Sequence, residues 1–204
     1  QLRESLKQRA CERIDALKND LVGISHDIHA HPEENFEEHY AHKRLTDAIG
    51  DNKLDVTRKA YDIDTAFDVA VGSKGATVAV LCEYDALPGI GHACGHNIIA
   101  AAGLGAGLAL AGLAEEAGGR LRLMGTPAEE GGGGKIEMAR KGAFVGVDAA
   151  MMVHPADREL ARMNAIAIQH CLVKYTGEAA HAAVSPHLGK NALDAAVLGY
   201  MNIA

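Results

Sequence analysis

The sequence has 204 residues, of which 48% are hydrophobic and 23% are charged. These values are ordinary for a folded protein and leave room for one domain and part of another. The net charge of −7 and the absence of a Lys/Arg cluster argue against nucleic acid as a partner. The four cysteines are widely spaced and no secretory signal precedes them, so we expect reduced thiols and a cytoplasmic location.

The N-terminal region predicts two helices. Residues 2–30 carry apolar side chains near helical spacing, and the helix should end before Pro32, because the residue before a proline avoids the helical conformation. A second helix is expected over about 36–49, before the breaker at 50–52.

Three apolar strands then alternate with helices. The strands are expected at 77–82, 121–126 and 149–153, and the helices at 97–117 and about 135–142. Segment 66–71 is expected to pair with the first strand as a hairpin through the turn 72–75. The alternation predicts an α/β fold with a largely parallel central sheet and helices on both faces. The apolar stretch 98–114 is short for a membrane span, so we expect a buried helix and no membrane partner.

The pattern changes after residue 163. An alternating segment at 165–175 predicts a strand, and Asn191 is expected to cap a final helix. We therefore expect a larger domain over 1–163 and, over 164–204, the start of a smaller α+β domain that looks truncated.

Residues of metal-ligand type follow the predicted strands. Cys94 and His96 flank Gly95 in a loop, so their side chains should project to the same side. A thiolate and an imidazole suit zinc and related transition metals. A buried free cysteine beside a capping histidine is the alternative for this loop alone. Glu130 and His154 also follow strand ends, where ligands gather in such sheets, and together they favour a metal site.

The pair Glu129-Glu130 suggests acid–base chemistry. Adjacent side chains diverge in an extended segment, so one carboxylate can bind metal while Glu129 transfers a proton. The alternative is a solvated acidic pair before a glycine turn. Glycines 131–134 and Lys135 resemble a phosphate loop but lack the Ser/Thr that should follow the lysine. We expect structural roles for His26, His29 and His31, and His181 taken by itself would be a surface histidine.

These residues occur in the order seen in a known family. The motifs are His31-Pro32-Glu33, Tyr84-Asp85-Ala86-Leu87-Pro88, His92-Ala93-Cys94-Gly95-His96, Pro127-Ala128-Glu129-Glu130-Gly131-Gly132-Gly133, His154-Pro155 and Gly177-Glu178-Ala179-Ala180-His181-Ala182. The chain resembles aminoacylase-type metallopeptidases and amidohydrolases, in the cysteine-ligand branch with hippurate hydrolase, auxin-conjugate hydrolase and aminobenzoyl-glutamate hydrolase. Glu83-Tyr84 in place of Asp-Met, and Asn97 in place of Asp, look like the sub-branch that also holds dipeptidases acting on basic or β-alanyl dipeptides.

The resemblance implies a two-metal exopeptidase-like fold. Residues 1–163 would be the N-terminal part of the metal-binding catalytic domain, and 164–204 the start of its lid or dimerisation domain. Cys94 would bridge two divalent ions, which could be zinc, manganese or cobalt. Further metal ligands would be His96, Glu130 and His154.

The implied reaction is hydrolysis of an amide bond in N-acyl amino acids or dipeptides, by attack of a metal-bound hydroxide on the carbonyl. Glu129 would be the general base, and Asp85 would orient a metal ligand. His181 would steady the oxyanion from the lid domain. The implied assembly is a homodimer through that domain, and a hetero-oligomer is an alternative.

Two other interpretations remain open. The family's last metal ligand is a histidine near the end of a longer chain and is absent from these 204 residues. One alternative is therefore a truncated, catalytically silent chain, or the non-catalytic subunit of a hetero-oligomeric amidohydrolase. A structural zinc protein is a weaker alternative, because Glu129 would have no task.

Overall fold

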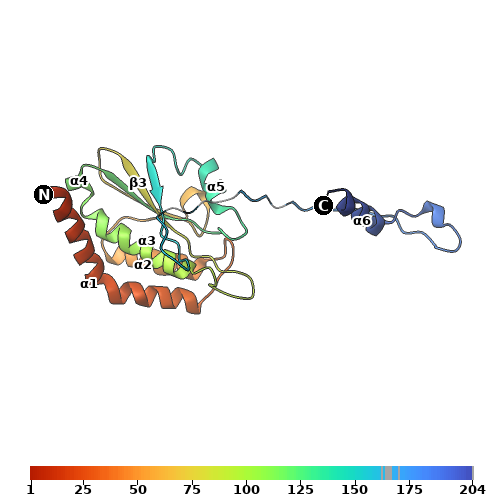
Figure 1. Cartoon of the computed structure of the whole chain (residues 1–204), viewed down its shortest axis with the longest axis horizontal. Coiled ribbons are helices and arrows are strands. Elements are labelled where there is room, and N and C mark those ends of the chain that lie inside the picture. Colours follow the sequence, from red (N-terminus) through yellow and green to blue (C-terminus); the bar gives the residue numbers. More distant parts are fainter. Residues whose placement is uncertain (162, 164–166, 170, 204) are drawn as a thin grey trace. The chain divides into compact units, whose positions relative to one another are not determined.

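The computed structural model describes residues 1–161, 163, 167–169 and 171–203, and it divides into two compact units, Gln1–Arg158 and Glu159–Ala204 (Figure 1). The first unit is an α/β structure. Its elements in chain order are α1 (Leu2–Ala30), α2 (His39–Asp51), β1 (Thr57–Arg58), the 3-10 turn η1 (Ala60–Asp62), β2 (Phe67–Val71), β3 (Thr77–Cys82), α3 (His96–Ala111), α4 (Ala114–Ala117), β4 (Arg120–Gly125), α5 (Gly134–Arg140) and β5 (Ala149–Met151).

The five strands form one sheet in the order β1-β2-β4-β3-β5. The three strands β4, β3 and β5 are parallel, with Val80 of β3 opposite Leu123 on one side and Met151 on the other. On the β4 side, β2 pairs antiparallel with β4, and β1 pairs antiparallel with β2. The predicted α/β class is confirmed, and the parallel strands place their carboxyl ends along one edge of the sheet.

The predicted hairpin between 66–71 and 77–82 is wrong. Strand β2 pairs with β4, which lies between β2 and β3. The connection must therefore span two strand spacings, about 10 Å. The segment does so by crossing closely over the turn before β4. A Cβ atom added to Gly72 would lie 2.3 Å from the carbonyl oxygen of Gly119. A Cβ atom added to Gly75 would lie 2.0 Å from the carbonyl oxygen of Gly118. The glycines that suggested a hairpin turn serve this close crossing.

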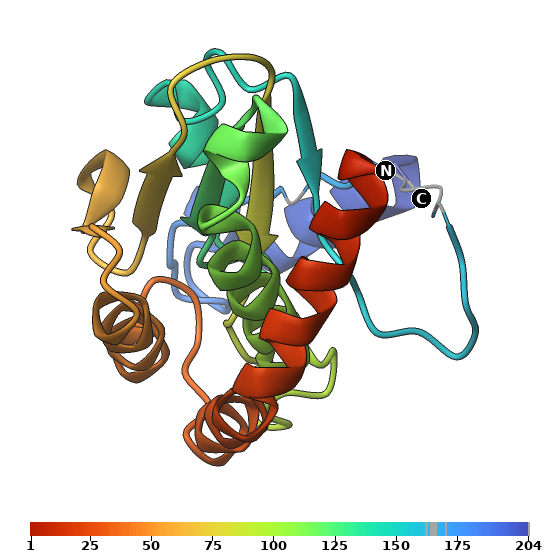
Figure 2. The same ribbon diagram turned by 90° about the vertical axis from the view of Figure 1, so that its left-hand side faces the viewer.

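Helices cover both faces of the sheet. On one face α1, α2 and α3 bury a large cluster that includes Ile28, Leu45 and Leu104 against the inward side chains of β2, β3 and β4. On the other face Met138 of α5 packs in a smaller cluster with Met124. Figure 2 shows α1 and α3 side by side on the same face.

Helix α3 lies unusually close to the sheet. A Cβ on Gly103 would meet Cys82 Sγ at 2.6 Å, and one on Gly107 would meet the Leu123 side chain at 2.6 Å. The glycines therefore allow the helix to approach β3 and β4. The predicted helix 97–117 divides into α3 and α4 around Gly112-Leu113. Within the described residues, no helix combines the length and apolar character needed to cross a membrane.

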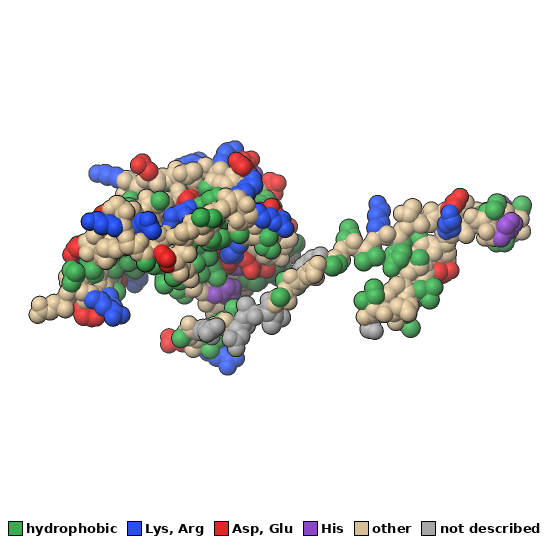
Figure 3. Space-filling view, turned by 90° about the horizontal axis from the view of Figure 1, so that it is seen from above, with side chains coloured by type: hydrophobic (Ala, Val, Ile, Leu, Met, Phe, Trp, Pro, Cys, Tyr) green, Lys and Arg blue, Asp and Glu red, His purple; other side chains and the backbone are tan. Residues whose placement is uncertain are grey.

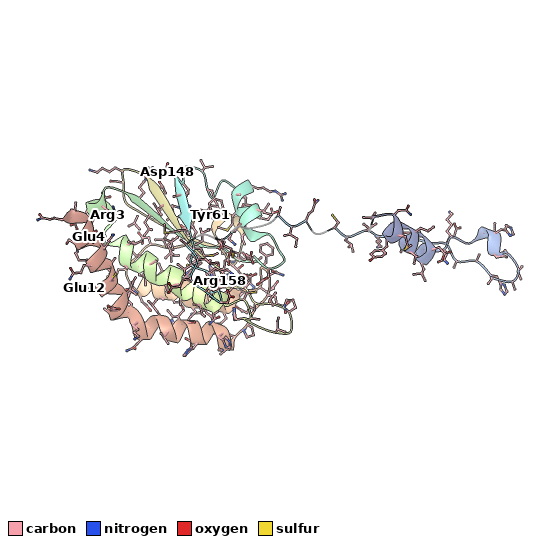
Figure 4. All side chains as sticks on the ribbon, viewed as in Figure 1. Arg3, Glu4, Glu12, Tyr61, Asp148 and Arg158 are labelled. Carbon is pink, nitrogen blue, oxygen red and sulfur yellow. The ribbon has the colours of Figure 1, made fainter. Side chains whose placement is uncertain are left out.

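Hydrogen bonds anchor the N-terminal end of strand β3, which is the end opposite to the polar segment 83–85. The first amide of the strand, on Thr77, donates to Asp148 Oδ2 at 2.7 Å, and Asp148 is labelled in Figure 4. Arg120 Nε donates to the Thr77 hydroxyl at 2.8 Å. These contacts fix the start of β3, and the carboxyl end of the strand then delivers the residues of the candidate site.

The second unit contains η2 (Pro186–Leu188) and α6 (Ala192–Ile203). Asn191 Oδ1 accepts the amide of Leu193 at 3.0 Å, which confirms the predicted cap. The strand expected over 165–175 is not found in the described residues 167–169 and 171–175, while 164–166 and 170 lie outside the described residues. An alternating segment needs a partner strand, and among the residues described none pairs with it.

Candidate metal centre

The candidate site begins where β3 ends. Glu83, Tyr84 and Asp85 are all buried. The Tyr84 hydroxyl donates to the carbonyl of Thr65 on one side of the chain. Two residues further along, the amide of Ala86 donates to the carbonyl of Glu33 at 2.8 Å. The segment is therefore held rigidly, and the alternation of an extended chain sends the side chains of Glu83 and Asp85 to the same side.

Asp85 forms hydrogen bonds to two separate segments of the site, the start of α3 and the loop after β4. Its Oδ1 lies 2.9 Å from Nδ1 of His96, and its Oδ2 accepts the Glu130 amide at 2.8 Å. Burial of Asp85 opposes its ionisation, but these two hydrogen bonds act together with the charge of His96 and a backbone hydrogen bond, and the net effect lowers the pKa of the carboxyl. Since an ionised carboxylate only accepts hydrogen bonds, Nδ1 of His96 donates, which leaves Nε2 available as a ligand.

The free nitrogen of His96 faces three carboxylates. His96 Nε2 lies 3.4 Å from Glu83 Oε2, 3.6 Å from Glu130 Oε1 and 3.8 Å from Glu129 Oε2. Burial would lower the pKa of His96, but the carboxylates of Asp85, Glu83 and Glu130 outweigh it and raise the pKa. Despite the short distances, neither His96 Nε2 nor Glu83 Oε2 makes a hydrogen bond with any described residue, although both atoms are buried.

Cys94 and His154 complete the site on its open side. A Cβ on Gly95, which has φ +77°, would lie 2.9 Å from Cγ of Pro155, so this glycine lets the segment after β5 approach the cysteine loop. The rings of His96 and His154 meet edge to face, with centroids 6.1 Å apart. An open depression of about 500 Å³ is lined by Cys94 and His154, together with His29 and His92.

The electrostatics of the site suit acid–base work. Burial, followed by the charge of Glu83, raises the pKa of Glu129, and Lys135 opposes this. A carboxylate whose pKa is raised is a better proton acceptor than an ordinary one. The carboxylate of Glu130 lies beside the Cys94 thiol and, with burial, raises its pKa to about 11. Metal binding at Cys94 therefore requires that the ion displaces the thiol proton.

The donor atoms fit a divalent metal ion. Two groups, Glu83 with His96 and His154, and His96 with Glu129 and Glu130, each place ligand atoms within 4.8 Å of one another. The buried atoms without hydrogen bonds, Glu83 Oε2 and His96 Nε2, are those that an ion would satisfy. Cys94 belongs to neither group, but its thiol lies beside Glu130 at the edge of the second. The nitrogen and oxygen donors, with this thiol alongside, suit zinc and neighbouring transition metals.

The structure brings together six of the residues predicted from the sequence. They are Asp85, Cys94, His96, Glu129, Glu130 and His154. His181 lies in the second unit, where its Nδ1 accepts the amides of Ala183 and Val184, so its catalytic role stays a prediction. His31 stacks on Tyr40, and the two ring centroids are 4.1 Å apart.

Sequence reasoning missed two residues of the site. Glu83 is a buried member of a ligand group, and Lys135 pairs with its carboxylate. Glu83 directly follows a buried strand and lies two residues before Asp85, and this spacing was a signal that could have found it.

Comparison with known proteins identifies relatives of the whole chain. A sequence profile described as peptidase family M20/M25/M40 matches residues 62–200. The Xaa-Arg dipeptidase of Mus musculus is 42% identical over 98% of this chain and 50% of its own length. One of the subunits of the p-aminobenzoyl-glutamate hydrolase of Escherichia coli is 37% identical over 92% of this chain and 43% of its own length. The chain therefore spans about half the length of these curated relatives.

Solved structures support the fold. A structure from methicillin-resistant Staphylococcus aureus matches with a TM-score of 0.61 at 26% identity, over 70% of this chain and 41% of the other. A structure from Bacillus subtilis, described as a dinuclear metal-binding peptidase, matches with a TM-score of 0.60 at 24% identity, over 67% of this chain and 42% of the other. Both similarities cover most of the present chain.

Proposed function

The chain belongs to peptidase family M20/M25/M40, and we propose that it is the metal-binding part of a hydrolase that cleaves the amide bond of N-acyl amino acids or dipeptides. The observation that carries this proposal is the buried, unpaired Nε2 of His96, which lies within 4 Å of three carboxylates beside Cys94. A structural zinc site would be closed and rich in cysteine, whereas this one opens to a depression and keeps a carboxylate free.

We assign the binding of two divalent ions to four side chains and the proton transfer to one. Cys94, His96, Glu130 and His154 would hold the ions, and Asp85 orients His96 through its hydrogen bond to Nδ1. Bound divalent ions supply activation of a water molecule and polarisation of the amide carbonyl. Zinc, manganese and cobalt all suit this donor set.

Glu129 is the proton carrier in this proposal. It follows Ala128, whose amide donates to Glu38 Oε1 at 2.8 Å, so the backbone that precedes the carboxylate is fixed. The side chain is 43% exposed and can reach both the ion site and a bound substrate. Glu129 would accept a proton from the attacking water and deliver it to the leaving amine.

The relatives suggest the substrate class. An Xaa-Arg dipeptidase and an aminobenzoyl-glutamate hydrolase both act on small molecules with an amide bond to an amino acid, as their names state. We propose the same class of substrate here. We further propose a cytoplasmic enzyme, because Cys94 must stay reduced, and one that dimerises through residues 164–204. In support of the interface, α6 exposes several large apolar side chains, namely Leu193, Val197, Leu198, Tyr200, Met201 and Ile203.

The proposal is tested by removing and restoring the metal. The product of the complete reading frame is stripped with a chelator and reloaded with zinc, manganese or cobalt. Release of free amino acid is then measured with N-acyl amino acids and dipeptides. Glu129→Gln should keep the metal and lose turnover by at least about 100-fold. Glu137→Gln, a carboxylate-to-amide change on α5, is the matched control and should keep full activity. Normal turnover in Glu129→Gln would contradict the assignment.

The name of one relative suggests a second candidate function, that of a subunit in a hetero-oligomeric enzyme. The E. coli protein is named as one subunit of its enzyme, so this chain could instead supply half of a hetero-oligomeric amidohydrolase. In that case the complete product would bind metal and show activity only after a partner protein is added. Activity of the purified protein alone would exclude this alternative.

A further inference from the structure

The mechanism proposed above leaves one buried acidic side chain without a task. Glu83 lies directly after β3, and its side chain is only 3% exposed. A buried carboxylate is costly unless it is paired or bound to a metal. One oxygen, Oε1, forms an ion pair with Lys135, whereas Oε2 has no hydrogen-bond partner among the described residues. Half of the carboxylate is therefore satisfied and half is free.

The unpaired oxygen of Glu83 lies close to a second buried atom that has no hydrogen bond to any described residue. Glu83 Oε2 lies 3.4 Å from His96 Nε2, which is also buried and without a hydrogen bond. A ligand atom of His154 lies within 4.8 Å of the ligand atoms of both. Two donors of a tetrahedral zinc ion at about 2.0–2.1 Å lie about 3.3 Å apart. The separation between the Glu83 oxygen and the His96 nitrogen therefore fits two ligands of one ion.

Lys135 reaches Glu83 because of the glycines that precede it. A Cβ on Gly134 would lie only 1.8 Å from the carbonyl oxygen of Pro127, so only glycine allows this tight turn. The turn starts α5 close to the end of β3 and places Lys135 as its second residue. The glycine-lysine sequence that resembles a phosphate loop thus brings a positive charge to a carboxylate.

We propose that Glu83 is a further ligand of the metal centre and that Lys135 positions it, holding Oε1 so that Oε2 faces an ion shared with His96 and His154. This inference rests on the proposed function, since it assigns two more residues to the same centre. The ammonium group also compensates one of the negative charges gathered there, which include those of Asp85 and Glu130.

The test measures metal binding directly. Metal-free protein is titrated with zinc by calorimetry, and the visible absorption of the cobalt-loaded protein reports the ligand set. Glu83→Gln should weaken binding of one ion by about 100-fold and change the cobalt spectrum, and Lys135→Met should weaken it by about 10-fold. Glu83→Asp keeps the negative charge but shortens the side chain and withdraws Oε2 from the ion, so it tests the same point if Glu83→Gln fails to fold.

Lys141→Met is the matched control. Lys141 follows α5 and pairs with Asp62 at 2.9 Å, away from the metal centre, so its loss should leave zinc affinity unchanged. Wild-type affinity and an unaltered cobalt spectrum in both Glu83 variants would overturn the assignment of Glu83. Wild-type affinity in Lys135→Met would overturn the positioning role. A wild-type protein that binds no metal would overturn the proposed function itself, so the two failures are distinguishable.

Discussion

The proposed metal centre consists of two halves that the fold supports differently. The side chains of Glu83, Asp85 and His96 are at most 3% exposed and are connected by hydrogen bonds and ion pairs to β3, α3 and α5. On the other side, His154 is exposed and Cys94 is half-buried. Residues in the buried half thus contribute to the fold as well as to binding, whereas those in the exposed half should contribute to binding alone.

The largest effect on stability is expected from Asp85→Ala. The substitution leaves His96 Nδ1 and the Glu130 amide without their partner in a buried site. Removal of one member of a buried polar pair typically costs about 3–5 kcal/mol of unfolding free energy. Urea unfolding measures the loss, and elemental analysis should show that metal is lost as well.

Asp148→Ala is the control for that variant. Asp148 also accepts a backbone amide, but at the opposite end of β3 (Figure 4). It should cost about 1 kcal/mol and leave metal content unchanged. If Asp85→Ala were no less stable than Asp148→Ala, the buried half would not support the fold.

An intermediate effect is expected from Gly103→Ala, which tests the packing behind the buried half. The added methyl group would meet Cys82 Sγ at 2.6 Å and the carbonyl oxygen of Leu81 at 2.8 Å. Such overpacking costs about 1–3 kcal/mol and should separate α3 from β3. Thermal unfolding and zinc affinity should both decrease. Gly23→Ala in α1 meets open space, and its helix propensity should make the protein slightly more stable. Equal behaviour of the two variants would contradict the close approach.

The smallest effect on stability is expected from His154→Ala. The exposed side chain contributes little to packing, so the unfolding free energy of the metal-free protein should change by no more than about 0.5 kcal/mol. Zinc affinity should nevertheless fall by at least about 10-fold, because a ligand is lost. His39→Ala, an exposed histidine on α2, should alter neither quantity. A large loss of stability in His154→Ala would remove the distinction between the halves.

The surface of the first unit does not share this concentration of charge. On the face shown in Figure 3, basic and acidic side chains are interspersed over residues 1–158. Its surface ion pairs, such as Arg9 with Glu116, are about half exposed and contribute little to stability. The informative charges are those that the fold buries at the sheet edge.

The parts of the fold with strong local patterns could be predicted from the sequence. Residues 2–30 and 77–82 were predicted with the same bounds as α1 and β3, because helical spacing and a β-branched apolar run are local signals. The gathering of Cys94, Glu130 and His154 could also be anticipated, since parallel strands share one carboxyl edge.

The features that could not be predicted from the sequence depend on contacts between residues far apart in the chain. The turn 72–75 has the residues of a hairpin, and only the insertion of β4 between β2 and β3 shows that its glycines serve a crossing. Glu83 resembled a substitution within a family motif, and its role depends on Lys135, which lies 52 residues further along the chain. Neither pairing leaves a periodic signal in the sequence.

Anomalous X-ray diffraction from crystals loaded with zinc tests the central claim most directly. We expect two anomalous peaks at the carboxyl edge of β3, with His96 Nε2 and Glu130 about 2.0–2.2 Å and Cys94 Sγ about 2.3 Å from an ion. A protein that crystallises in zinc with no peak at this edge, or with a single peak that contacts neither Cys94 nor His96, would contradict the proposed metal centre.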